Sequence, residues 1–431
     1  MFRYLNVLLV LVTLTILSAC TGITGTSDNV MRTPSGHAVE ENLPDFTTPD
    51  IASNGQAPLQ TTMDGRFQPT PFYQRPNGQT MSSATDRTTA HASTMDLPEV
   101  KLAILVPLSG PQASLGQSML NAAQLALFDV NANNITIIPQ DTTTGAETAA
   151  RNAINEGAQI ILGPLFAQDV KAVSPIAQAQ NIPVIAFSTD WTAATQNTYI
   201  MGFLPFGQVS RVVDYAAKRG VKNISALIPQ TPYGAAVNGS LRHEAQRQNM
   251  ILNQSIGFDN QTLPQAVKQL AASRHSEALM LPIGGAQLVQ TATALRQDNW
   301  NFGNTRLLGT GLWDDSAQAP NVIPGSWYAA PDPRLRTRFN DKYAQTFQQQ
   351  PPRLATLAYD ATALAAALAV KGLRETGKPA YSRSDLTNPS GFAGLDGVFR
   401  FRPDGLAERA LAILELRQGG SVVIDPAPTR F

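Results

Sequence analysis

The sequence predicts an α/β fold with two doubly wound parallel sheets, one following the other along the chain. Three observations lead to this prediction. From about residue 99, short apolar runs alternate with segments of helical spacing, which is typical of parallel strands joined by crossover helices. This alternation occurs as two successive sets. Residues 99–431 are also numerous enough to build two lobes.

The first set begins with the apolar run "VKLAILVPL", which ends in the turn Ser109-Gly110-Pro111. In the segment after it, Leu120, Ala123 and Leu127 share one face of a predicted helix. The set continues with strands expected at 134–141, 159–164 and 182–190 and with helices expected at 146–158 and 166–180.

The second set begins with a helix expected at 206–219. Strands are expected at 223–229, 252–258, 277–283 and 305–311, and the helices between them end near residues 249 and 298.

The N-terminal residues predict export. Arg3 precedes an almost unbroken apolar stretch at 7–17, and two small residues follow. A stretch this short is typical of a secretory signal and too short to span a membrane comfortably. Leu17-Ser18-Ala19-Cys20 resembles a bacterial lipobox, which implies that a signal peptide at 1–19 is removed and that Cys20 is then acylated.

Cys20 is the only cysteine in the 431 residues. A disulfide framework and cysteine-rich zinc sites are therefore excluded. Thr21 stands where an aspartate would retain such a lipoprotein in the inner membrane, so the resemblance implies a lipid anchor in the outer membrane, on its periplasmic face.

Residues 20–98 differ in composition from the rest of the chain. They are rich in Thr, Ser, Pro, Gly, Asn and Gln, and no period of 3.6 or 2 is sustained. Such a segment buries too little apolar surface to offset its conformational entropy. We expect a disordered tether, with a mean span of ~50 Å as a flexible coil.

Charge and motifs exclude several classes of function. The chain has 32 basic and 32 acidic residues, so its charge balance does not point to a nucleic-acid partner. No G-x-S-x-G elbow and no phosphate-binding G-x-x-x-x-G-K-[ST] loop occurs, and the four histidines are scattered. We therefore expect no catalytic residues, no metal site and no cofactor.

Several segments resemble type I periplasmic binding proteins of the leucine-binding class. They include "KLAILVPLSGPQASLGQSMLNAAQLAL", "IILGPLFAQDVKAVSPIAQAQNIPVIAFST" and the closing "GFAGLDGVFRFRPDGLAERALAILEL". The resemblance covers residues 99 to about 425 and implies two lobes joined by a hinge of three crossings. One lobe is expected at about 99–204 and 332–395, and the other at about 205–331 and 396–431.

Ligands of open parallel sheets meet the crevice beyond the carboxyl ends of the strands. The candidate ligand-binding residues at these ends are Ser109, Asp141, Phe166, Ser188, Thr189, Tyr233, Trp313 and Asp314. In the amino-acid binders, hydroxyl and backbone N–H groups hold the carboxylate of the ligand and acidic residues hold its ammonium. Ser188 and Thr189 match this pattern, whereas Leu165-Phe166 replaces a frequent serine. Trp313 and Asp314 either cap an ammonium or serve helix capping and loop packing.

Two functions are compatible with these patterns. The chain resembles penicillin-binding protein activators, outer-membrane lipoproteins with a domain of this fold, which implies regulation of peptidoglycan synthesis through a bifunctional synthase. The alternative is a lipid-anchored solute-binding protein of a branched-chain amino-acid ABC transporter, with a small-molecule ligand in the cleft. The long tether favours the activator. Neither function is enzymatic.

Overall fold

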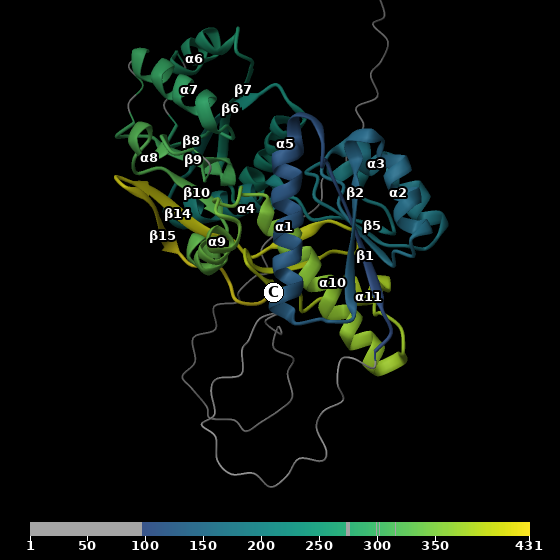
Figure 1. Ribbon diagram of the computed structural model, residues 1–431. Helices are drawn as coiled ribbons and strands as arrows, with labels where there is room; N and C mark the ends of the chain where they lie inside the picture. The colour runs from purple at the N-terminus through teal and green to yellow at the C-terminus, as the bar shows by residue number, and fades with distance from the viewer. Residues whose placement is uncertain (1–96, 273–275, 299, 301, 315) are drawn as a thin grey trace, which may run out of the picture. The chain divides into compact units, whose positions relative to one another are not determined.

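The computed structural model describes residues 97–431 except 273–275, 299, 301 and 315. Within this part the chain forms two large sheets covered by helices and one short sheet (Figure 1). The prediction of an α/β fold with two mainly parallel sheets is confirmed.

The first sheet is parallel throughout, with strand order β2-β1-β3-β4-β5. Its strands are β1 (Val100–Val106), β2 (Ile135–Asp141), β3 (Ile160–Leu162), β4 (Val184–Ala186) and β5 (Thr198–Ile200). The helices after the strands are α1 (Ala113–Val130), α2 (Ala146–Asn155) and α3 (Ala167–Ala179), with 3₁₀ turns η2 (Gly110–Gln112), η3 (Thr142–Thr144) and η4 (Trp191–Ala193).

Side chains of β1 alternate between two apolar cores, one on each face of this sheet. Leu102 and Ile104 pack with α1 and the later helix α10 (Ala355–Thr376), whereas Ala103 and Leu105 pack with α2 and α3. A parallel sheet that is covered on both faces needs apolar side chains at every strand position. This explains why β1 is an almost unbroken apolar run.

The second sheet has strand order β15-β14-β10-β9-β8-β6-β7. Its strands are β6 (Asn223–Pro229), β7 (Ile251–Phe258), β8 (Ala278–Met280), β9 (Arg306–Thr310), β10 (Trp327–Ala330), β14 (Ala412–Arg417) and β15 (Gly420–Asp425). The helices are α4 (Pro205–Lys218), α5 (Pro232–Arg247), α6 (Leu263–Ala271), α7 (Gly285–Gln297) and α8 (Ala319–Val322), with the 3₁₀ turn η5 (Gly311–Trp313). β14 pairs antiparallel with both β10 and β15, so it alone runs against the other strands of this sheet.

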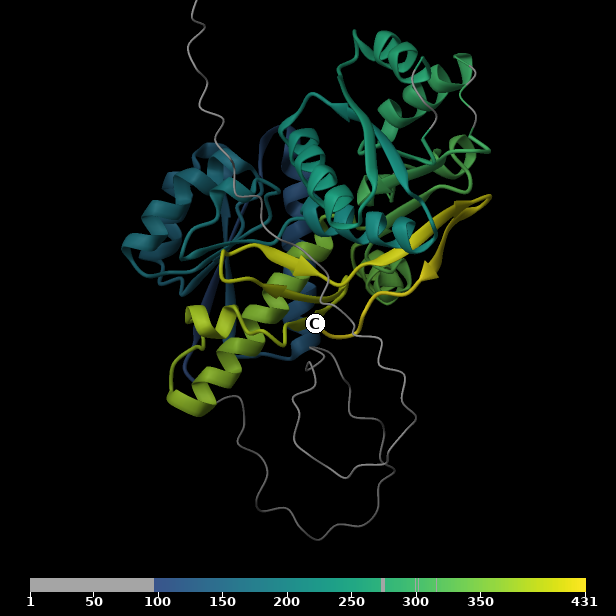
Figure 2. The ribbon, with the colours of Figure 1, turned by 180° about the vertical axis from the view of Figure 1, so that it is seen from behind.

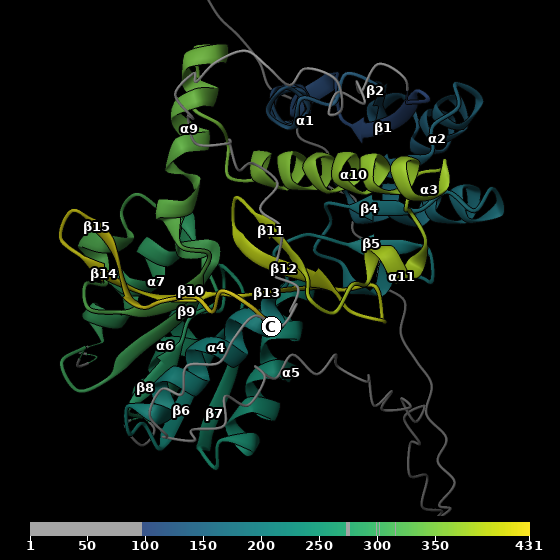
Figure 3. The same ribbon diagram turned by 90° about the horizontal axis from the view of Figure 1, so that it is seen from below.

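The third sheet, β11-β12-β13, is short and antiparallel. It consists of β11 (Phe392–Gly394), β12 (Gly397–Phe401) and β13 (Ala407–Arg409), and it follows α9 (Pro333–Phe347), α10 and α11 (Arg383–Leu386). Seen from behind, the last strands lead from this sheet into β14 and β15 of the second sheet (Figure 2). Seen from below, α10 runs along the side of the first sheet (Figure 3).

The structure adds two features to the predicted order. β5 is an edge strand of three residues that the apolar pattern did not reveal. The expected lobe boundary at 395/396 falls inside the third sheet, where Phe399 and Phe401 belong to the core of the first sheet. Ile413, in β14, packs in a core of the second sheet. The division into lobes stays a prediction.

The signal peptide expected at 1–19, Cys20 and nearly all of the tether expected at 20–98 lie outside the described residues. In the part of the chain that the structure describes, the search for a helix long and apolar enough to cross a membrane found none.

The turn between β11 and β12 depends on Gly394. A Cβ atom at this position would lie 2.4 Å from Oδ2 of Asp360, a carboxyl group buried in α10. The backbone N–H of the next residue, Leu395, donates to Oδ1 of the same carboxyl at 2.8 Å. The glycine therefore lets the turn close onto Asp360.

We predict that Gly394→Ala lowers the free energy of unfolding by about 1–3 kcal/mol, the usual cost of overpacking a tight site. Urea denaturation of the full chain measures this. Gly257→Ala is the matched control, because Gly257 is also in a strand but its added Cβ would meet only ordinary contacts, at 3.5 Å and beyond. An equal effect of both substitutions would contradict the role of Gly394.

Candidate functional site

A cavity of about 200 Å³ lies where the chain passes between the two large sheets. Its polar lining residues are Thr189, Gln208, Tyr233, Asp314, Arg353 and Arg409. The rest of its lining is apolar or glycine: Gly202, Phe203, Leu204, Gly207, Gly311, Leu312, Pro331, Leu354, Ala407 and Leu411.

Three crossings of the chain contribute to this lining. The first, 202–204, joins β5 to α4, the second includes Pro331 between β10 and α9, and the third, 407–411, joins β13 to β14. A molecule in the cavity would thus touch all three connections between the sheets.

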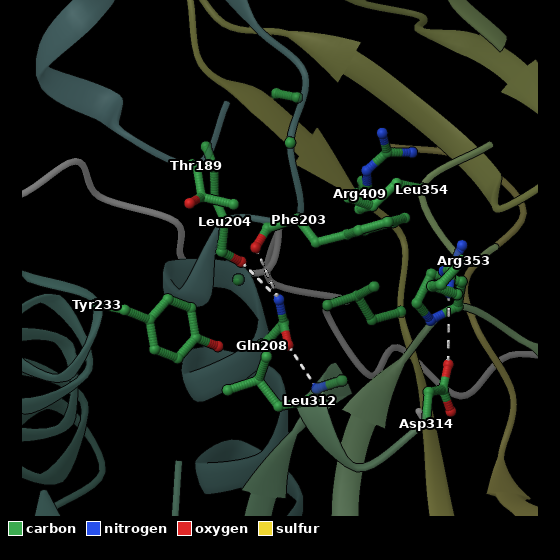
Figure 4. A pocket seen from close by; sticks show the side chains of 16 residues that line it. Thr189, Phe203, Leu204, Gln208, Tyr233, Leu312, Asp314, Arg353, Leu354 and Arg409 are labelled. Atoms are coloured by element: carbon green, nitrogen blue, oxygen red, sulfur yellow. Dashed lines mark hydrogen bonds and ion pairs between the residues drawn. The ribbon is translucent and has the colours of Figure 1, made fainter. Parts of the chain in front are cut away.

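Gln208 ties the first crossing to the end of β9 (Figure 4). Its Nε2 donates to the carbonyl of Leu204 at 2.9 Å, and its Oε1 accepts from the N–H of Gly311 at 2.6 Å. Its side chain is buried in this arrangement. Gln208 thereby links the N-terminus of α4 to the segment that follows β9.

Tyr233, at the start of α5, closes another side of the cavity. Its hydroxyl donates to Oγ1 of Thr310 at 3.0 Å. Burial raises the pKa of Tyr233 to about 12, although the bond to Thr310 works in the opposite direction. The hydroxyl therefore stays protonated and neutral under physiological conditions.

Asp314 follows η5 and is almost enclosed, with a side chain 5 % exposed. The hydroxyl of Tyr328 donates to its Oδ1 at 2.8 Å, and Nη1 of Arg336 lies 3.3 Å from its Oδ2. Nε of Arg353 approaches the same Oδ2 at 3.7 Å. One carboxylate is thus shared by two arginines.

Arg353 is also paired with a second acid. Its Nη2 and Nη1 lie 2.9 and 3.1 Å from the two carboxylate oxygens of Asp396, which is 1 % exposed. Thr356 donates to the same carboxylate at 2.7 Å. Burial opposes ionisation of Asp396, but Arg353 and Arg409 outweigh burial and lower its pKa below the ordinary value.

Asp360 has a different environment in the same cluster. Burial, and after it the charge of Asp396, raise the pKa of Asp360 to about 7. Its Oδ2 has no hydrogen-bond partner among the described residues. Asp360 therefore favours its protonated form more than an ordinary aspartate does.

The structure places three of the candidate ligand residues at the cavity: Thr189, Tyr233 and Asp314. Ligand binding by them stays a prediction. The structure places the other five elsewhere, and two of these are buried. Oγ of Ser188 accepts from the N–H of Asp190 at 3.0 Å, and Trp313 packs in the core of the second sheet.

The remaining three candidates lie at the ends of β1, β2 and β3. Desolvation opposes ionisation of Asp141, but hydrogen bonds from Ser109, Thr143 and Leu108 lower its pKa to about 2. This carboxylate thus stabilises its own loop. Phe166 is 43 % exposed at the start of α3 and is not among the lining residues of the cavity, and Leu165 beside it is buried in the first core.

Sequence reasoning missed Phe203, Gln208, Arg353 and Arg409 as lining residues. All but Arg353 lie within a few residues of a chain crossing. The expected crossing near 204/205 was a usable signal for Phe203 and Gln208, whereas nothing in the pattern singled out the two arginines. The arrangement offers hydrogen-bonding groups around an apolar space, which suits noncovalent binding. Among the described residues, no group of three His, Cys, Asp or Glu side chains suits a metal ion.

Comparison with known proteins defines the class of this protein. The family model "Periplasmic binding protein" matches residues 99–421. The chain therefore belongs to the periplasmic binding protein family.

Solved structures share the fold at low sequence identity. A branched-chain amino acid ABC transporter periplasmic ligand-binding protein of Burkholderia xenovorans is 17 % identical, with a TM-score of 0.62, over 76 % of this chain and 94 % of that one. A solute-binding protein of Rhodopseudomonas palustris in complex with 3,4-dihydroxybenzoic acid is 19 % identical, with a TM-score of 0.58, over 77 % and 97 %. A leucine-binding protein of Thermotoga maritima is 17 % identical, with a TM-score of 0.55, over 76 % and 99 %.

Among curated proteins, an uncharacterized protein of Rickettsia prowazekii is 24 % identical over 173 residues. The match covers 40 % of this chain and 46 % of that relative, so the chain spans less than half the length of the curated relative it matches.

The buried Asp360 carboxyl leads to a prediction about pH. Its folded-state pKa of about 7 lies above the unfolded value of ~3.9, so between these pH values the folded state holds a proton that the unfolded state has lost. This contribution to the free energy of unfolding is complete below pH ~4 and is lost as pH rises to about 7. Asp360→Asn should flatten the decline. Urea denaturation from pH 4.5 to 7.5 measures it, and equal slopes in both proteins would contradict the assignment.

Proposed function

We propose that this protein reversibly binds a small solute in the cavity, as the periplasmic solute-binding component of an ABC transporter. The observation that carries the proposal is the position of the cavity, which is lined by all three crossings between the sheets. A solute there contacts both lobes at once. It would stabilise whichever lobe arrangement it binds more tightly.

Two further observations support this proposal. The family match covers most of the chain, and relatives of the same fold include a leucine-binding protein and proteins in complex with benzoate or isoleucine. The cavity volume of about 200 Å³ is below the usual range for drug-sized ligands, so the solute is small. The protein acts by binding and not as an enzyme.

A solute screen tests the proposal. Wild-type full chain should show a raised melting temperature with its solute, corresponding to ~2.7 kcal/mol at a concentration one hundred times the dissociation constant. Leu312→Trp should weaken binding at least tenfold, because Leu312 lines the cavity and an indole would occupy part of its volume.

Leu335→Trp is the matched control. Leu335 is 44 % exposed and Leu312 is 39 % exposed, but Leu335 lies on α9 and is not among the lining residues. Leu335→Trp should change the affinity for the solute less than twofold in calorimetric titration. If no periplasmic solute raises the melting temperature, the proposed function is wrong.

A second proposal is that the chain is an outer-membrane lipoprotein that binds and activates a bifunctional peptidoglycan synthase. The observation that favours it is the sequence of residues 1–98, with its lipobox and its polar segment. The anchor would hold the domain near the cell wall and raise its effective concentration there. Activation requires tighter binding to the active synthase than to the inactive one.

We predict that Cys20→Ser removes the protein from the outer-membrane fraction and abolishes incorporation of labelled palmitate, because the acylated thiol is lost. The wild-type chain should co-purify with a bifunctional synthase and raise its glycan polymerisation rate severalfold. Palmitate incorporation that survives the substitution would contradict the anchor. A synthase rate unchanged by saturating wild-type chain would contradict the second proposal and leave the first intact.

A further inference from the structure

The charged groups around the cavity determine what kind of solute it accepts. Two arginines, Arg353 and Arg409, and one acid, Asp314, line it. Asp314 is already shared by Arg336 and Arg353, at 3.3 and 3.7 Å, and it accepts from the hydroxyl of Tyr328. An ammonium group of a ligand would be a third cation at a carboxylate whose charge is already compensated.

The acids at neighbouring strand ends are occupied as well. Oδ1 of Asp141 accepts from the N–H groups of Leu108 and Thr143, both at 2.9 Å. Oδ2 of Asp190 lies 2.7 Å from Nζ of Lys171. Among the described residues, the carboxylates of Asp314 and Asp190 are thus already paired with cations, and the carboxylate of Asp141 is held by N–H groups of its own loops.

In contrast to these acids, Arg409 has hydrogen-bond donors that lack acceptors in the described part of the chain. Its Nη2 donates to the carbonyl of Met201 at 2.9 Å, but its Nε and Nη1 are buried and have no hydrogen-bond partner among the described residues. Asp396, the nearby full negative charge, already forms a two-point contact with Arg353. Buried guanidinium donors without an acceptor are costly, so an incoming anion would relieve an existing deficit.

Arg409 also lies in the wall of the cavity. It lines the cavity from β13, with its guanidinium carbon 5.0 Å from the ring centre of Phe203, another lining residue. In Figure 4 the guanidinium points away from Gln208 and Asp314. Contact with a ligand in the cavity therefore requires a different rotamer of Arg409, in which its planar pair of donors would match the two oxygens of a carboxylate.

We infer that the solute is a small carboxylate with an apolar body and no ammonium group, and that Arg409 binds its carboxylate. The inference rests on the proposed solute-binding function. The apolar body would contact the hydrophobic lining residues Phe203, Leu204, Leu312, Leu354 and Leu411. Recognition by Arg409 also gives a role to the third sheet, which carries this residue into the wall of the cavity.

Two matched sets of probes test the inference on the full chain in calorimetric titration. The first set is 4-methylpentanoate, leucine and 3-methylbutylamine, and the second is 3-phenylpropanoate, phenylalanine and 2-phenylethylamine. Within each set the apolar body is constant and only the charged groups change. We expect at least one of the two carboxylates to bind, its amino acid to bind at least tenfold more weakly, and its amine to give no detectable heat.

Arg409→Lys should weaken the bound carboxylate at least tenfold, because an ammonium cannot form the two-point contact. Arg400→Lys is the control: Arg400 lies on the adjacent strand β12, pairs with Glu408 at 2.7 Å and is not among the lining residues. It should change the affinity less than twofold. If Arg409→Lys does not fold, the relative affinities of the six probes for the wild-type chain decide whether the inference holds.

The inference is overturned if an amino acid binds as tightly as its matched carboxylate, if a folded Arg409→Lys variant retains wild-type affinity, or if none of the six probes binds. The proposed function has a separate criterion. It fails only if the wider solute screen also gives no response.

Discussion

The buried ion pair between Arg353 and Asp396 is the contact on which the arrangement around the cavity depends. Their side chains are 10 % and 1 % exposed, and removing such ions from water costs several kcal/mol each unless geometry and hydrogen bonds compensate. The two-point contact and the bond from Thr356 supply that compensation. Held in this way, Arg353 presents its Nε to Asp314 and lies over the ring of Phe203, so one ion pair positions groups on two sides of the cavity.

The turn that contains Gly394 and precedes Asp396 is also needed for this buried ion pair. Gly394 leaves room for the Asp360 carboxyl, and the N–H of Leu395 bonds to it, which directs the next side chain toward Arg353. Burial raises the pKa of Asp360, and the charge of the nearby Asp396 raises it further. Asp396 has the direct arginine partner and keeps its charge. Nε and Nη1 of Arg409 have no hydrogen-bond partner in the part of the chain that the structure describes.

These charges connect the two proposed functions. A solute that binds Arg409 would alter the cluster that joins the third sheet to α10 and, through Arg353 and Asp314, to the second lobe. A partner that docks on both lobes would respond to the same change, provided that it prefers one lobe arrangement. Solute binding and synthase regulation are therefore physically compatible in one chain, and the cavity is the element that would couple them.

The fold follows from the sequence alone because apolar periodicity reports burial on two faces, and each strand of the two predicted sets occurs in the structure. The rule that ligands meet the carboxyl ends of strands also led to Thr189, Tyr233 and Asp314 as residues near the cavity. Tertiary structure decided the rest. Ser188 and Thr189 are neighbours, yet backbone direction turns one hydroxyl inward and leaves the other at the cavity. Gln208, Arg353 and Arg409 come together only because three distant segments cross between the sheets, and no local pattern records a contact made across such distances in the chain.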